Sequence, residues 1–95
     1  MNKISKIPIK DWAEDDQPRE KLLHKGPAVL SNAELIAILI GSGNTDESAV
    51  ELSKRIMMEV NDNFAELARL TIQDLQKYKG IGEAKAITIA AALEM

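Results

Sequence analysis

Two glycines one residue apart, Gly80 and Gly82, separate two stretches whose apolar residues repeat at helical spacing. Thr71 and Asp74 match a capping-box pattern, with Asp in place of the usual Glu or Gln, and predict the start of a short helix. The glycines end that helix, because they adopt backbone angles that other residues resist. The sequence from 71 to 95 therefore predicts a helix, a tight turn and a second helix. The residues expected to face the core are Ile72, Leu75, Tyr78, Ile81, Ala86, Ile89 or Ala90, and Leu93.

The same turn predicts an anion-binding site. The first N–H groups of the second helix have no acceptor within it and lie at the positive end of its dipole. Because the two glycines carry no side chain, a phosphate oxygen can approach those N–H groups closely, and three lysines add positive charge. The predicted phosphate-binding residues are Lys79, Gly80, Ile81, Gly82, Glu83, Ala84 and Lys85, with Lys77 nearby. The alternative is that the glycine pair forms only a tight turn that packs two helices.

The pattern Leu-x-x-x-x-Gly-Ile-Gly-x-x-x-Ala, from Leu75 to Ala86, resembles the helix-hairpin-helix module. The resemblance implies a grip on the sugar–phosphate backbone of DNA without reading of the bases. Lys79 stands where that module often has proline, which implies a slightly looser hairpin with an added charge.

Composition favours packed helices over a sheet. The 95 residues allow one small domain, and 45% of them are hydrophobic while only 3% are aromatic. A core built from Leu, Ile, Val, Ala and Met is typical of helices, since sheets favour aromatic and β-branched residues. The fold class that we expect is all-α, with two helix-hairpin-helix-like units, the second one well formed.

Charge and cysteine content limit the function. A net charge of −3 opposes strong nucleic-acid binding, so any DNA contact is expected to be local, weak and salt-sensitive. The absence of cysteine excludes disulfides and thiolate metal sites. With no signal peptide and no apolar run long enough for a bilayer, we expect a cytoplasmic protein without a membrane partner. No metal and no cofactor are expected.

The N-terminal part is expected to combine an arm with a helix. Residues 1–17 predict an extended arm, because Pro8 opposes a helix, and Trp12 is interpreted as its anchor on the core. Residues 18–25 predict a short helix, capped by Asp16 or Gln17, with Leu22 and Leu23 on its buried side. The expected organisation is therefore an arm over 1–17 followed by a single helical domain over 18–95. His24 is interpreted as a solvated surface residue, because no second histidine exists to complete a metal site.

The middle of the chain predicts two further helices. Ser31 and Glu34 form a capping box ahead of an apolar run to position 40, which indicates a central helix. Ser48 opens a longer helix to about Val60, in which Glu51 and Arg55 are spaced for a weak salt bridge. The buried stripe expected in this helix is Ala49, Leu52, Ile56 and Val60, with Lys54 and Met58 exposed, and the expected connecting helix carries Phe64, Leu67 and Leu70.

The chain thus repeats the order helix, Gly-x-Gly, helix at 31–60 and 71–95. The repetition predicts two hairpins that share one core. The first loop is longer and carries Asp46 and Glu47, which repel phosphate, so we interpret it as structural.

Three separated blocks resemble the N-terminal region of the bacterial RadC-like family. They are Ile9–Leu23, Leu30–Ile40 and Lys79–Ala86, and the resemblance runs from about Ile9 to Glu94. It implies a role in DNA repair and a following JAB/MPN-type domain with a zinc site built from a His-x-His pattern and an aspartate. This sequence has one histidine and resembles the N-terminal domain alone, with the C-terminal domain absent.

Three functions compete at this point. The first is a DNA-backbone-binding module of a RadC-like repair protein, built on the turn at 80–82. The second is a protein-interaction or tethering domain that positions the metallopeptidase-like domain implied by the resemblance, so that its partner is that domain or another protein. The third, a free-standing enzyme, lacks a nucleophile–base set, paired carboxylates in a cleft and metal-ligand spacing, so we expect no catalysis by this chain.

Overall fold

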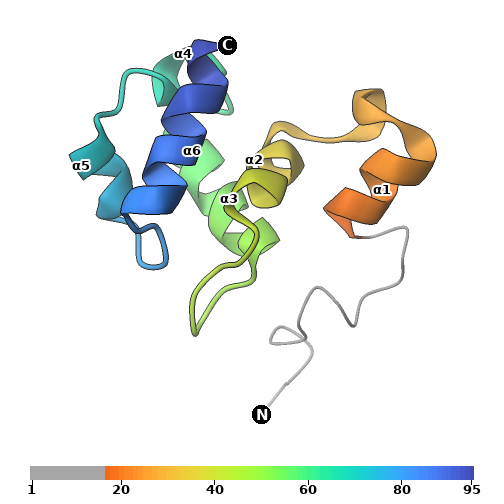
Figure 1. The fold of residues 1–95 in the computed structure, drawn as a ribbon, viewed down its shortest axis with the longest axis horizontal. Coiled ribbons are helices and arrows are strands. Elements are labelled where there is room, and N and C mark those ends of the chain that lie inside the picture. Colours follow the sequence, from red (N-terminus) through yellow and green to blue (C-terminus); the bar gives the residue numbers. More distant parts are fainter. Residues whose placement is uncertain (1–16) are drawn as a thin grey trace.

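The computed structural model describes residues 17–95, and every element within that range is helical (Figure 1). The all-α prediction is confirmed. The elements are α1 (Pro18–Lys25), the 3-10 helix η4 (Pro27–Val29), α2 (Asn32–Ile40), α3 (Ala49–Glu59), α4 (Phe64–Leu67), α5 (Ile72–Gln76) and α6 (Glu83–Glu94). The arm expected at 1–17, with Trp12, lies outside the described residues except for Gln17, which occupies the N-cap position of α1. No helix in the described range is long and apolar enough to cross a membrane.

Capping boxes mark where α2, α3 and α5 begin. Ser31 starts α2, Ser48 starts α3 and Thr71 starts α5, and each forms a complete capping box with the acidic residue three positions later. Each cap satisfies two backbone N–H groups that the helix leaves without a partner. The predicted helix starts at 31, 48 and 71 are therefore confirmed by their hydrogen bonds.

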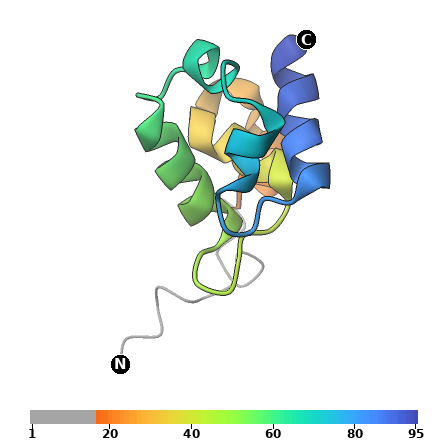
Figure 2. The ribbon, with the colours of Figure 1, turned by 90° about the vertical axis from the view of Figure 1, so that its left-hand side faces the viewer.

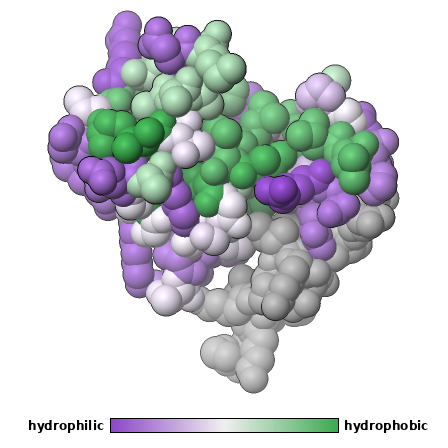
Figure 3. Space-filling view, in the orientation of Figure 1, coloured by the Kyte–Doolittle hydropathy of each residue, from purple (hydrophilic) through white to green (hydrophobic). Residues whose placement is uncertain are grey.

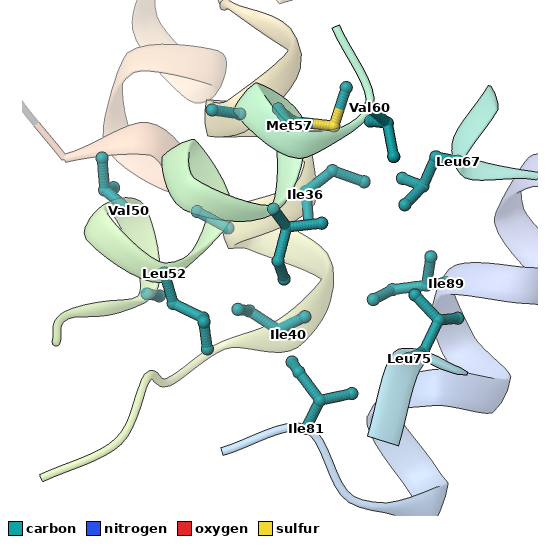
Figure 4. Packing of buried hydrophobic residues seen from close by; sticks show 14 of the residues in the cluster. Ile36, Ile40, Val50, Leu52, Met57, Val60, Leu67, Leu75, Ile81 and Ile89 are labelled. Carbon is teal, nitrogen blue, oxygen red and sulfur yellow. The ribbon is translucent and has the colours of Figure 1, made fainter. Parts of the chain in front are cut away.

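The core lies between α2, α3, α5 and α6. Figure 2 shows α2 between α3 and α6, as expected for the helix that is apolar on nearly every side. Figure 4 shows the buried side chains of these helices meeting one another. The buried cluster contains all four residues expected on α3, together with Leu67, Leu75, Ile81, Ala86 and Ile89, while Phe64, Leu70, Ile72, Tyr78 and Leu93 pack against it partly buried.

Helix α1 departs from the prediction in its buried side. Leu23 is 74% exposed, and the buried residue of this helix is Pro18. Helix α1 packs against α2 and η4, and its leucines are neither in the buried cluster nor among the partly buried residues packed against it. An ion pair of 2.6 Å between Lys21 Nζ and Glu34 Oε2 joins α1 to α2.

Candidate nucleic-acid interface

The turn between α5 and α6 needs glycine at position 80 for two reasons. Gly80 has φ +98°, a backbone conformation that side-chain-bearing residues rarely adopt. A Cβ atom there would also lie 2.8 Å from the carbonyl oxygen of Gly43 in the loop between α2 and α3. The N–H of Ile81 donates to the carbonyl oxygen of Tyr78 at 3.0 Å and closes the turn. Ile81 is buried and points toward Ile40 in Figure 4, so the expected packing role of this residue is confirmed.

Gly82 differs from Gly80 because nothing in its backbone requires glycine. It is the N-cap of α6 with φ −90° and ψ −171°, an ordinary extended conformation, and no atom lies within 4 Å of an added Cβ. Gly82, Glu83 and Ala84 are exposed, and within residues 17–95 no acceptor takes a hydrogen bond from their N–H groups. The start of α6 therefore presents backbone donors to solvent at the positive end of the helix dipole.

The two predicted lysines lie near this helix start, and both are engaged by the loop between α2 and α3. Lys79 Nζ lies 3.1 Å from Asp46 Oδ2, in a pair whose side chains are 62% and 68% exposed. Lys85 Nζ donates to the carbonyl oxygen and to Oγ of Ser42, both at 2.9 Å. The third lysine, Lys77, pairs with Asp74 at 3.6 Å. The sequence predicted that these lysines flank the turn, but it did not reveal their partners.

The loop between α2 and α3 and the loop between α5 and α6 are joined by these contacts into one surface. Both loops lie at the same end of the molecule in Figures 1 and 2. Asn44 Nδ2 donates to the carbonyl oxygen of Lys79 at 2.8 Å and to Glu47 Oε1 at 2.9 Å. Asn44 Oδ1 in turn accepts from the N–H groups of Asp46 and Glu47, both at 2.8 Å. Through Asn44 the first loop is hydrogen-bonded to the backbone of the second. The interpretation of the first loop as structural rather than phosphate-binding stays a prediction.

Glu47 connects this loop to α3. Arg55 donates to Glu47 through Nε at 2.8 Å and through Nη2 at 2.9 Å. These hydrogen bonds, with that from Asn44, lower the pKa of Glu47 to about 2. The predicted pair between Glu51 and Arg55 is wrong, because Glu51 bends back to the N–H of Ser48 and completes the cap of α3.

Tyr78 ties α3 to the turn after α5. Its hydroxyl donates to Glu59 Oε1 at 2.6 Å, and the guanidinium of Arg55 lies 5.5 Å from its ring centre. Burial, together with the hydrogen bond to Glu59, raises the pKa of Tyr78 to about 12. The hydroxyl is protonated at neutral pH, as that of an ordinary tyrosine is, and its hydrogen bond to Glu59 holds the turn to α3.

The described residues contain no cluster of side chains suited to bind a metal ion. No group of three or more His, Cys, Asp or Glu side chains within 17–95 could hold a metal ion. His24, interpreted from the sequence as a surface residue, is exposed and lies 3.7 Å from Glu20 on the same helix.

Comparison with known proteins gives the family. The UPF0758 N-terminal family matches residues 9–87, more than half of the chain. The chain belongs to the UPF0758 family. This is the RadC-like family that the three sequence blocks resembled. No solved structure matches the chain.

Proteins named UPF0758 protein are similar over nearly the whole chain. The one from Flavobacterium johnsoniae is 57% identical over 91 residues, which is 96% of this chain and 39% of the relative. The one from Trichlorobacter lovleyi is 43% identical over 94 residues, 97% of this chain and 41% of the relative. The one from Methanosarcina mazei is 42% identical over 92 residues, with 97% and 39% covered. The chain thus spans about two fifths of the length of these UPF0758 relatives.

Proposed function

We propose that this UPF0758 domain binds the sugar–phosphate backbone of DNA without reading bases, as the helix-hairpin-helix resemblance of α5 and α6 implies. The observation that carries the proposal is the exposed start of α6, where the N–H groups of Gly82, Glu83 and Ala84 have no acceptor within residues 17–95. Gly82 leaves the approach to them open. A phosphate oxygen supplies the missing acceptor and the complementary charge.

Lys79 and Lys85 can contribute to phosphate binding at the start of α6 with little loss of existing interactions. The exposed pair between Lys79 and Asp46 is worth at most about 1 kcal/mol, so a phosphate can replace Asp46 on Lys79. Lys85 binds neutral groups of Ser42, and its positive charge therefore remains uncompensated by that contact. Asp46 and Glu83 lie close by and oppose a phosphate, which keeps binding weak and salt-sensitive.

The proposal is tested by titrating a fluorescent DNA duplex with the protein at low and moderate salt. Contact with one or two phosphates predicts that the logarithm of the affinity falls with the logarithm of the salt concentration with a slope of about −1 to −2. Gly82→Asp places a carboxylate at the N-cap of α6, where it accepts from the same N–H groups and repels phosphate. We expect this variant to lose binding and to keep its helical circular dichroism.

Ala65→Glu is the matched control, because it changes the charge equally at an exposed position of α4, which Figure 1 shows at the opposite end of α6. We expect it to bind DNA like the unaltered protein. If Gly82→Asp binds DNA as well as Ala65→Glu does, the start of α6 is not the site.

A second candidate is a tethering domain that positions the rest of the protein, which the resemblance implies to be metallopeptidase-like. The chain's coverage of about two fifths of its relatives favours this function, since those proteins contain much that this domain must be joined to. In both candidates the domain acts in the cytoplasm and leaves catalysis to other parts of the protein. The absence of binding at low salt in the titration favours tethering.

A further inference from the structure

An apolar surface remains outside the core on α1 and α2. We call the α1–α2 face the surface formed by Leu23 of α1 with Leu35 and Ile38 of α2. Leu23 is 74% exposed, and the two α2 residues are partly exposed although the same helix buries Ile36 and Ile40 on its other side. Figure 3 shows hydrophobic residues gathered as a band over α2 and α1. Exposed apolar residues that gather in this way mark interaction surfaces.

The packing of α1 on α2 continues this face into a groove. A cavity of about 230 Å³ between the helices is lined by Gln17, Pro18, Arg19, Ala37, Ile38, Gly41 and Ala49. Helix α1 runs opposite to α2, because Arg19 shares the cavity with Ile38 while Lys21 bonds Glu34 further back along α2. Leu23 follows Arg19 by one helical turn. Leu23 therefore lies on the side of α1 that carries Arg19.

Arg19 adds a positively charged group to the groove, which a docking surface has to match. Its side chain is exposed and makes no ion pair within residues 17–95. A surface that docks there is expected to carry apolar side chains for Leu23 and Ile38, with a carboxylate or a backbone carbonyl for the guanidinium.

The relatives contain a further region that is a candidate to cover this face. Each of the three UPF0758 proteins has about three fifths of its length outside the match to this N-terminal domain. Helix α6 runs opposite to α2, since Lys85 near its start contacts Ser42 just after the end of α2. The end of α6 therefore lies toward the start of α2, the helix that carries Leu35 and Ile38. A region joined there reaches the α1–α2 face at high effective concentration.

We propose that the α1–α2 face is the docking surface for the part of UPF0758 proteins that follows this domain. This inference deepens the tethering function, and it does not depend on the proposed phosphate-binding site at the start of α6. It assigns positions 23, 35, 38 and 19 to contact with the rest of the same protein.

The experiment joins this chain, carrying Leu23→Asp, to the part of the F. johnsoniae UPF0758 protein that lies outside the match. Met58→Asp is the matched control, because Met58 is 77% exposed on α3 and lies outside the face. Hydrogen exchange by mass spectrometry is measured in segments beyond the N-terminal domain, together with sedimentation velocity. We expect Leu23→Asp to speed exchange several-fold in one contiguous segment and to make the particle less compact, while Met58→Asp behaves like the unaltered protein.

Two results would overturn the proposal. One is unchanged exchange beyond the N-terminal domain in Leu23→Asp. The other is a dimer that Leu23→Asp converts to monomer while that exchange stays unchanged, which would assign the face to a second copy. Arg19→Glu is a second variant in case Leu23→Asp alters the helix locally, and it should release the same segment. The Leu23→Asp protein should still bind DNA through α6, so the outcomes of the two proposals are separable.

Discussion

Gly80 and Gly82 look equivalent in the sequence and have different functions in the structure. Gly80 has a positive φ and no room for a side chain, whereas Gly82 has ordinary backbone angles and open space around it. Gly80 therefore serves the fold. Gly82 leaves the start of α6 uncovered, which the proposed phosphate binding requires and the fold does not.

Substitution by alanine separates these roles. Gly80→Ala combines an unfavourable φ with a Cβ 2.8 Å from the Gly43 oxygen, so we expect it to lower the free energy of unfolding by at least about 2 kcal/mol. Gly82→Ala should stay within about 1 kcal/mol of the unaltered protein. Urea unfolding measures both, and equal losses in the two variants would contradict the assignment.

The carboxylate of Glu47 makes stability depend on pH. Its pKa is lowered from 4.5 to about 2 in the folded protein, so the stabilisation is complete above about pH 4.5 and is lost as the pH falls toward 2. We expect the difference in unfolding free energy between the unaltered protein and Glu47→Gln to shrink over that interval. A difference that stays constant with pH would show that the Arg55 contact does not set the pKa of Glu47.

At the scale of the element, short-range signals were sufficient to predict where helices begin. The caps at Ser31, Ser48 and Thr71 act within three residues, so the sequence contains the whole interaction. The start of the helix at 49 was predictable for the same reason, and its buried stripe was predictable from the helical spacing of its apolar residues. Arg55 was misassigned because two acids lie within its reach, and the cap of α3 decides which of them is available.

The cap of α3 gives a direct test. Ser48 Oγ accepts from the N–H of Glu51 at 3.1 Å, and Ser48→Ala removes this acceptor. We expect a loss of about 1 kcal/mol in the free energy of unfolding, while Ser48→Asp, which keeps an acceptor, retains most of the stability. Thermal or urea unfolding of the pair measures the effect, and equal destabilisation by both substitutions would argue against the capping bond.

At the scale of the whole molecule, the contacts between distant segments were not predictable from one sequence. Lys79 meets Asp46 from 33 positions away, and Lys85 meets Ser42 from 43 positions away. Such contacts depend on how the two helix pairs pack, and no local pattern encodes them. The exposure of Leu23 escaped prediction similarly, because apolar character alone does not say whether a neighbouring helix is present. The phosphate-binding role of residues 79–85 remains a prediction.

The most direct test of that role records amide chemical shifts during titration of the ¹⁵N-labelled protein with a short DNA duplex at low salt. The account predicts that the largest shifts occur at the N–H groups of Gly82, Glu83 and Ala84, and that added salt reverses them. Largest shifts on another element, or none at these three amides, would contradict the claim that the start of α6 binds a phosphate.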